Sequence, residues 1–150
     1  DVPCSGLGAL RRRPEARWRK SPRDIADLLP LQRQLLEAAC EVTRPGGVIA
    51  YVTCSQHAAE TQNIVAEILE TGKVRLLDTQ SILQSVALPS AEGQSTLAGD
   101  KAPGYRPQVR LKKSSSVRQE DILDEASTTA QLWPHTHGTD AMFLALFRKN

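Results

Sequence analysis

The sequence predicts an α/β fold, namely the C-terminal half of a doubly wound sheet. Two apolar runs, Val48–Val52 and Met142–Phe147, have the composition of buried strands. Apolar residues recur at helical spacing from Ile25 to Val42 and again from Ile64 to Leu69. The glycine-rich G-x-G-x-x-G loop that opens the first half of such a sheet does not occur in this sequence.

The first elements alternate between strand and helix. Residues 1–8 have the pattern of a strand end followed by a glycine-containing turn. A helix is predicted to begin at Ser21-Pro22-Arg23-Asp24, because serine can cap it, proline fits its first turn and aspartate suits its positive end. Pro30 is expected to kink or divide this helix, and Pro45-Gly46-Gly47 ends it. The run Val48–Val52 suits a strand of a parallel sheet that is covered on both faces.

The second half is predicted to be less regular. A helix is expected over residues 58–70, followed by a short strand at Lys73–Leu77. Residues 79–131 are rich in Gly, Ser, Pro, Gln and Thr, and we interpret them as a long irregular insertion with one helical turn at Asp121–Ala126. The strand at Met142–Phe147 closes a single domain that spans residues 1–150.

Composition excludes several classes of protein. Hydrophobic residues make up 40% and charged residues 24% of the chain, as in ordinary soluble globular proteins. No stretch approaches the ~20 apolar residues of a membrane span, and residues 1–20 lack the apolar run of a signal peptide. The three cysteines have no zinc-binding spacing. We therefore expect a cytoplasmic protein with reduced thiols and with no metal or membrane partner.

Positive charge is concentrated between Arg11 and Arg23, where seven basic residues accompany one acid, Glu15. Such a block suits a polyanion, and it follows directly on the loop that contains Cys4, so we interpret it as a nucleic-acid surface. Trp18 is suited to stacking on a base, although packing against the following helix is at least as good an interpretation. The residues predicted to contact nucleic acid are Arg11, Arg12, Arg13, Arg17, Trp18, Arg19 and Lys20. A second basic cluster, between Arg106 and Arg118, is interpreted as solvated surface.

Two cysteines stand where a strand is predicted to end and a loop to begin. Cys4 lies in Asp1-Val2-Pro3-Cys4-Ser5-Gly6, and Cys54 lies in Tyr51-Val52-Thr53-Cys54-Ser55. Ligands bind at that edge of an open α/β sheet, so the pair suggests a thiolate nucleophile and an assisting thiol. A nearby helix start is expected to lower the pKa of Cys54. From position alone, a packing role is an equally good interpretation of Cys54 and the preferred one of Cys4.

Other candidate ligands have simpler interpretations. Cys40 lies within the first predicted helix beside Ala38, Ala39 and Val42, and we assign it to the core. His135 and His137 have no third ligand nearby, so loop packing is preferred to a metal site.

These motifs together resemble a known family. The chain is similar to the C-terminal part of an S-adenosylmethionine-dependent RNA (cytosine-5) methyltransferase of the Fmu/Sun type, a bacterial enzyme that modifies small-subunit ribosomal RNA. The resemblance covers residues 1–78 and 132–150. It departs from the family at Thr61, where Asn is usual, and at Ala141, where Gly is common. The matching residues are Asp1 to Gly6, Arg12-Arg13-Pro14, Trp18, Gln32, Leu35-Leu36, Pro45-Gly46-Gly47, Thr53-Cys54-Ser55, Glu60 and His137-Gly138-Thr139-Asp140.

The resemblance implies methyl transfer from S-adenosylmethionine to carbon 5 of a cytosine, giving 5-methylcytosine in ribosomal RNA of the small subunit. Cys54 would be the nucleophile that adds to carbon 6 of the base, and Cys4 would assist release of the methylated product. Asp1 would contact the cofactor and the cytosine edge. The seven basic-segment residues named above would then bind RNA.

Two alternatives remain open. In DNA (cytosine-5) methyltransferases the cysteine of the Pro-Cys loop is the nucleophile, and the presence of Thr53-Cys54 argues against that class. A non-catalytic RNA-binding fragment is the other alternative, because the donor loop would lie upstream of Asp1. On either the main interpretation or this alternative, we expect the 150-residue chain alone to have little or no activity.

Overall fold

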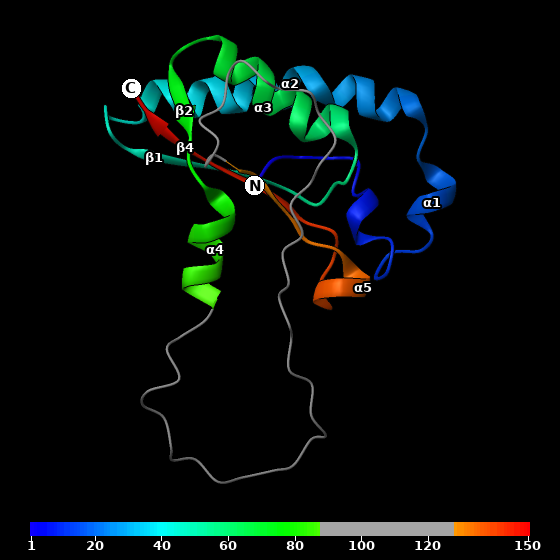
Figure 1. Cartoon of the computed structure of the whole chain (residues 1–150). Helices are drawn as coiled ribbons and strands as arrows, with labels where there is room; N and C mark the ends of the chain where they lie inside the picture. Colours follow the sequence, from blue (N-terminus) through cyan, green and yellow to red (C-terminus); the bar gives the residue numbers. More distant parts are fainter. Residues whose placement is uncertain (88–127) are drawn as a thin grey trace, which may run out of the picture.

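Helices and strands form an α/β fold in the computed structural model (Figure 1), which describes residues 1–87 and 128–150. The α/β class predicted from the sequence is thereby confirmed. The second basic cluster and the helical turn predicted at Asp121–Ala126 lie outside the described residues, as does most of the predicted insertion.

Strand β4 (Phe143–Lys149) is the centre of the sheet. It pairs with β1 (Val48–Thr53) along one edge and with β2 (Val74–Leu76) along the other, and both pairs are antiparallel. The short strand β3 (Ala130–Gln131) also pairs antiparallel with β4. The parallel environment predicted for Val48–Val52 is therefore wrong for the described strands. Strands β1 and β2 do run in the same direction, but the last strand of the chain lies between them and runs against both.

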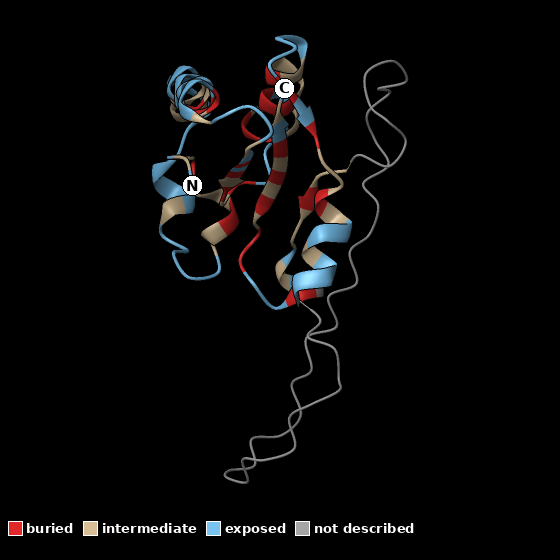
Figure 2. Cartoon of the chain, turned by 90° about the vertical axis from the view of Figure 1, so that its left-hand side faces the viewer, coloured by how far each residue is buried: buried red, intermediate tan, exposed pale blue. Residues whose placement is uncertain are grey.

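One face of this sheet is covered by two helices, α2 (Pro22–Val42) and α3 (Gln62–Glu70), which lie side by side in Figure 1. Their apolar residues pack with alternate residues of the strands into one core, which appears as the buried layer in Figure 2. The ring of Tyr51 on β1 meets the ring of Phe143 on β4 edge-on, with centroids 6.4 Å apart. The core residues are Leu36, Cys40, Ile49, Tyr51, Ile64, Val65, Ile68, Val74, Leu76, Phe143, Ala145 and Phe147.

The other face of β1 is open within the described part of the chain. Ile49, Tyr51 and Thr53 alternate toward the helices and are buried, whereas Val48 is 54% exposed and Ala50 is exposed. The sequence predicts cover on both faces of this strand, so for the described residues that prediction is wrong. A continuous apolar run is a signal of strand formation, and it does not say which face a helix will cover.

Helix α2 begins where the sequence predicts. The backbone N–H and the hydroxyl of Ser21 both donate to the carboxylate of Asp24, at 2.6 and 2.9 Å, and Pro22 occupies the first turn. The helix is continuous to Val42, so the expectation that Pro30 would divide it is wrong. Leu29, before Pro30, is partly buried against the core, and Leu36 and Cys40, after it, are part of that core. This packing offsets the hydrogen bond that proline lacks.

Helix α4 (Thr79–Ala87) corrects the prediction of irregular structure from residue 79. Asp78 organises its start, because its carboxylate accepts hydrogen bonds from the N–H and hydroxyl of Ser81 at 3.2 and 2.6 Å. The hydroxyl of Thr128 also donates to Asp78, at 2.6 Å, and so links the first residue of the second described range to the start of α4. Serines and glutamines separate the few apolar residues of this helix, Ile82, Leu83 and Val86, so its helical spacing is a weak signal. The two-residue strand β3 is too short to leave a pattern.

The remaining elements are short turns of helix: η1 (Leu7–Ala9), α1 (Ala16–Arg19), η2 (Ala58–Glu60) and α5 (Pro134–His137). The helix predicted over 58–70 is present as η2 and α3, which meet at Thr61. The predicted strands Lys73–Leu77 and Met142–Phe147 correspond to β2 and β4. Among the helices of the described ranges, none has the length and apolar character needed to cross a bilayer.

Candidate active site

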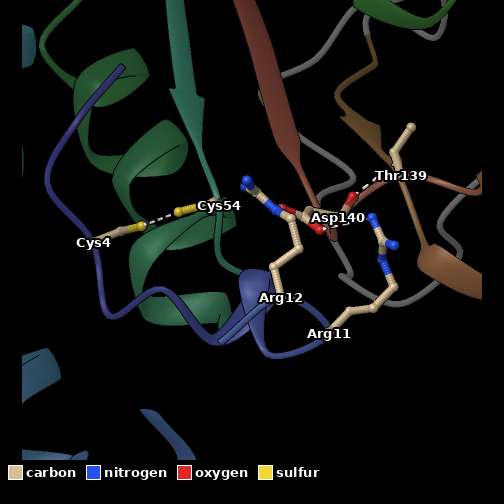
Figure 3. Close-up of polar contacts among 6 residues, drawn as sticks. All are labelled: Cys4, Arg11, Arg12, Cys54, Thr139 and Asp140. Atoms are coloured by element: carbon tan, nitrogen blue, oxygen red, sulfur yellow. Dashed lines mark hydrogen bonds and ion pairs between the residues drawn. The ribbon is translucent and has the colours of Figure 1, made fainter. Parts of the chain in front are cut away.

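The two predicted cysteine loops meet. The Sγ atoms of Cys4 and Cys54 are 3.0 Å apart, within hydrogen-bonding distance for thiols, although the residues are separated by 50 positions in the chain (Figure 3). Both side chains are half-buried, and neither is in a disulfide. Cys54 follows directly on β1, and the segment that holds Cys4 runs beside that strand, because the N–H of Val2 donates to the carbonyl of Val52 at 3.0 Å.

The segment before β4 joins the two cysteine loops through Gly8. The N–H of Gly8 donates to the carbonyl of Cys54 at 2.9 Å, and its carbonyl accepts from the N–H of Ala141 at 3.0 Å. A Cβ on Gly8 would lie 2.0 Å from the carbonyl oxygen of Ala141 and 2.7 Å from that of Cys54. Only glycine permits this approach of three backbones. The Pro-Cys loop, the Thr-Cys loop and the segment before β4 are thus fixed against one another.

The acidity of Cys54 differs from the prediction. Burial raises the pKa of Cys54 to about 11, and the hydrogen bond and charge of Cys4 add to the effect. The sequence predicts a lowered pKa from a nearby helix start. The helical turn η2 begins at Ala58 and helix α3 begins at Gln62. The thiol of Cys54 instead lies beside the thiol of Cys4 in a partly desolvated site. In this form of the protein the thiol is protonated at neutral pH.

Thr53 precedes Cys54 and is completely buried, with its partner Phe143 opposite it on β4. Its hydroxyl oxygen has no hydrogen-bond partner among the described residues. Such a group costs free energy on burial, so the hydroxyl contributes nothing to holding the strand end in this form.

Arg11 and Arg12 both contact Asp140, in the segment before β4. The Nε of Arg12 donates to Oδ2 of Asp140 at 2.6 Å, and a terminal nitrogen of Arg11 lies 3.4 Å from Oδ1 (Figure 3). Asp140 is 8% exposed, and the hydrogen bond from Arg12 lowers its pKa below the usual value. Figure 3 also shows the Arg12 guanidinium turned toward the Cys4–Cys54 pair. The sequence predicts both arginines as RNA contacts, and it does not reveal this carboxylate partner.

The rest of the basic segment is exposed. Arg13, Arg17, Arg19 and Lys20 form no ion pair with any residue in the described ranges. Trp18 is 81% exposed, and the guanidinium of Arg17 lies 5.2 Å from its ring centroid. Packing of Trp18 against the following helix, one of the two interpretations offered by the sequence, is therefore wrong. The indole remains available to a partner from outside.

Asp1 lies at the start of the segment beside β1 and is exposed. Cys40 is buried in the core, as predicted, and burial raises its pKa. His137 is buried, and its Nδ1 accepts a hydrogen bond from the N–H of Trp133 at 2.7 Å. Within residues 1–87 and 128–150 there is no group of three or more His, Cys, Asp or Glu side chains that could hold a metal ion.

Sequence reasoning assigns no role to Glu60, yet this residue organises the site. Its carboxylate is completely buried and accepts four hydrogen bonds, from the N–H and hydroxyl of Ser5, from Gln32 Nε2 and from the hydroxyl of Ser55. Burial alone would raise the pKa of Glu60, but these hydrogen bonds together lower it. The signal in the sequence is a carboxylate five residues beyond Ser55, which becomes informative only once its burial is known.

Comparison with solved structures defines the class of protein. The chain superposes on the crystal structure of PH0851 with a TM-score of 0.65 and 27% identity, over 99% of this chain and 25% of that one. It also superposes on NSun6 from Pyrococcus horikoshii, with a TM-score of 0.59 and 25% identity, over 99% of this chain and 28% of that one. A methyltransferase homologue from the same organism matches equally well, with a TM-score of 0.59 and 26% identity, over 99% of this chain and 37% of that one. The fold is that of the Sun-type methyltransferases.

The family follows from the sequence match. The model of the family described as "16S rRNA methyltransferase RsmB/F" matches residues 1–148, and the chain belongs to this family. The resemblance to the Fmu/Sun type found in the motifs is thereby confirmed.

Curated relatives of this chain are also named as methyltransferases. A protein of Mycobacterium tuberculosis (strain H37Rv) that is named as a methyltransferase is 46% identical over 149 residues, which are 99% of this chain and 25% of the relative. Ribosomal RNA small subunit methyltransferase B of Klebsiella pneumoniae (strain 342) is 35% identical over 99 residues, 66% of this chain and 22% of the relative. The chain thus spans about a quarter of the length of the curated relatives that it matches.

Proposed function

We propose that this chain carries the catalytic cysteine of an enzyme that methylates carbon 5 of a cytosine in small-subunit ribosomal RNA. The observation that carries the proposal is the contact between Cys4 and Cys54 at 3.0 Å, at the end of β1 and beside an arginine. The ribosomal RNA substrate is supported by the name of the family and by the name of the Klebsiella relative.

The proposed reaction uses Cys54 as a covalent nucleophile. Its thiolate adds to carbon 6 of the cytosine, which makes carbon 5 able to accept a methyl group. Loss of the carbon 5 proton and elimination of the Cys54 sulfur then restore the aromatic ring and free the enzyme. Because burial and Cys4 raise the pKa of Cys54 to about 11, its thiol has to lose a proton before its sulfur adds to the cytosine.

The distance between the two sulfurs supports a role for Cys4 in the last of these steps. Its sulfur is within hydrogen-bonding distance of the Cys54 sulfur, so it is close to the bond that breaks on elimination. A thiol there can exchange a proton with the base or with the departing sulfur. We propose that Cys4 promotes release of the methylated product, and that it does not form the adduct.

The methyl donor proposed for the whole enzyme is S-adenosylmethionine, which supplies an electrophilic methyl group. This proposal is supported by the crystal structure of NSun6 with SFG, an analogue of this cofactor. In this chain the candidate contact is Asp1, which is exposed. The chemical roles proposed for residues of this chain belong to Cys54 and Cys4.

The proposed RNA surface is the basic segment that follows the Pro-Cys loop. Arg13, Arg17, Arg19 and Lys20 present exposed positive charge, and Trp18 presents an exposed ring for stacking. Arg11 and Arg12 are both held by Asp140, and Figure 3 shows the Arg12 guanidinium turned toward the cysteines, so we propose that Arg12 faces the target nucleotide.

A methylation assay tests the proposed function. The full-length protein, incubated with labelled S-adenosylmethionine and unmodified 16S ribosomal RNA, should give 5-methylcytidine on digestion of the RNA. Cys54→Ala should abolish the product, whereas Cys40→Ala, which removes a thiol outside the site, should retain it. Methylation of duplex DNA in place of RNA, or a product methylated at another atom, would overturn the proposal.

A further inference from the structure

The buried carboxylate of Glu60 connects the two cysteine loops. Oε1 accepts from the backbone N–H of Ser5 at 2.8 Å, and Oε2 accepts from the hydroxyls of Ser5 and Ser55, each at 2.6 Å. Ser5 is the neighbour of Cys4, and Ser55 is the neighbour of Cys54. One side chain therefore holds the residue that follows each thiol.

A second layer fixes the carboxylate itself. Nε2 of Gln32, on α2, donates to Oε1 of Glu60 at 3.1 Å and to the carbonyl of Pro3 at 2.9 Å. The hydroxyl of Tyr51, on β1, donates to the backbone carbonyl of Glu60 at 2.8 Å. Gln32 on α2 and Tyr51 on β1 thus orient Glu60. Gln32 also binds Pro3, the residue before Cys4.

Burial makes this network decisive for the geometry. Ser5, Gln32, Ser55 and Glu60 are each at most 2% exposed. These groups are shielded from bulk solvent, so removing the carboxylate takes away the acceptor of four buried donors at once. Neutral residues could fill the same volume, but only a carboxylate offers acceptors for all four donors at once.

We propose that Glu60 is a positioning residue that brings Cys4 and Cys54 into contact by binding the serine that follows each of them. The inference rests on the proposed function for its catalytic meaning, because the geometry that Glu60 maintains is that of the nucleophile and the release thiol. It assigns Glu60 no contact with the base or the methyl donor.

The first readout is the proximity of the thiols, measured without any substrate. In the full-length protein, glutathione disulfide exchanges with Cys4 and Cys54 to give one intramolecular disulfide and two molecules of glutathione. Mass spectrometry measures the ratio of the Cys4–Cys54 disulfide to the reduced protein at equilibrium. This ratio gives the effective concentration of one thiol near the other. Glu60→Ala should lower it by about 10-fold or more, since the buried serines lose their acceptor.

The second readout is the rate of adduct formation with RNA that contains 5-fluorocytosine. A misplacement of about 1 Å at a reacting group can cost about 100-fold in rate, so Glu60→Ala should slow the adduct by about 10-fold or more. Glu60→Gln retains one acceptor oxygen for Ser5 and Gln32, and its amide can donate to the two serine hydroxyls. This conservative variant should therefore recover most of both readouts.

The matched control is Glu67→Gln. Glu67, on α3, forms an ion pair with Arg33 on α2, and its side chain is 43% exposed, so this change loosens a carboxylate contact between helices without touching the cysteine loops. It should change neither readout. Thermal melting shows whether each variant is folded. If Glu60→Ala does not fold, Ser5→Ala and Ser55→Ala, which each remove one donor and leave the carboxylate, should still lower the effective concentration.

The outcomes separate this inference from the proposed function. A folded Glu60→Ala, or folded serine variants, with unchanged thiol equilibrium and adduct rate would overturn the positioning role and leave the methyltransferase proposal intact. Alternatively, the variants could shift the thiol–disulfide equilibrium as expected while even the wild-type protein forms no RNA adduct. That result would support the positioning role of Glu60 and overturn the proposed chemistry.

Discussion

At the scale of single residues, the acidity of Cys54 has a direct consequence. With a pKa raised to about 11 by burial and by Cys4, the thiol is almost entirely protonated at neutral pH. For such a pKa, about one thiol in 10⁴ is ionised at pH 7. We therefore expect Cys54 to be alkylated and oxidised slowly at neutral pH when no RNA is bound.

This predicts slow, strongly pH-dependent alkylation of Cys54. Its rate with iodoacetamide should rise about 10-fold per pH unit through the range from 7 to 10. Cys4→Ala removes the hydrogen bond and the charge that raise the pKa, so the profile should move to lower pH and Cys54 should react faster at pH 7. Peptide mass spectrometry measures both. A wild-type profile that levels off below pH 8, or no shift in Cys4→Ala, would contradict the raised pKa.

The sequence predicts which residues meet but not all of their surroundings. Cys4 and Cys54 are identified as a pair because each follows a predicted strand, and the structure brings their sulfurs together. The motif spacing contains no information about burial, so the direction of the Cys54 pKa and the role of Glu60 could not be deduced from it. Asp140 as the partner of Arg12 depends on a contact across 128 residues, beyond any local pattern.

At the scale of elements, the basic segment divides into two groups. Arg11 and Arg12 are held by Asp140, whereas Arg13, Arg17 and Arg19 have no carboxylate partner in the described residues. An arginine that already neutralises a carboxylate releases fewer counterions from RNA than an unpaired one. The two groups should therefore contribute differently to the salt dependence of binding.

We predict that Arg13→Ala, Arg17→Ala and Arg19→Ala together weaken RNA binding and flatten its salt dependence by about one unit of slope per lost phosphate contact. Neutralising Arg11 and Arg12 should also weaken binding, with a smaller change of slope. Fluorescence anisotropy with labelled ribosomal RNA at several salt concentrations provides the comparison, and Glu15→Gln in the same segment is the control. Equal slopes for the wild type and both sets of variants would show that this segment does not bind phosphate.

Local sequence chemistry predicts the elements better than their pairing. The serine–aspartate cap and the apolar spacing locate α2 and α3, and the apolar runs locate β1 and β4. Strand β4 lies between β1 and β2 and runs antiparallel to both. This pairing depends on contacts between distant residues, so no local run of residues predicts it. Helix α4 has only three large apolar residues, Ile82, Leu83 and Val86, among serines and glutamines, so its helical spacing is a weak signal in the sequence.

At the scale of the whole molecule, we propose that the chain supplies one part of a larger site. It spans about a quarter of the length of the relatives, and its described residues offer Asp1 as the candidate contact for a methyl donor. One or two hydrogen bonds contribute about 1 kcal/mol each. Micromolar binding requires about 8 kcal/mol. The two cysteines are therefore expected to need further residues before they can work.

We predict that a protein consisting of residues 1–150 alone does not bind S-adenosylmethionine with micromolar affinity and has little or no methyltransferase activity. Calorimetric titration of this chain, beside the full-length protein as the positive control, measures the difference. Stoichiometric micromolar binding by residues 1–150 would show that the donor site lies within this chain.

The central claim is that Cys54, and not Cys4, forms the covalent bond to cytosine. The most direct measurement is to trap the full-length protein on RNA that contains 5-fluorocytosine and to map the modified peptide by mass spectrometry. We predict a nucleotide on Cys54, its loss in Cys54→Ala, and accumulation of RNA-linked protein in Cys4→Ala, because the release thiol is then absent. An adduct on Cys4, or one that persists in Cys54→Ala and disappears in Cys4→Ala, would contradict the claim and favour the arrangement of DNA methyltransferases.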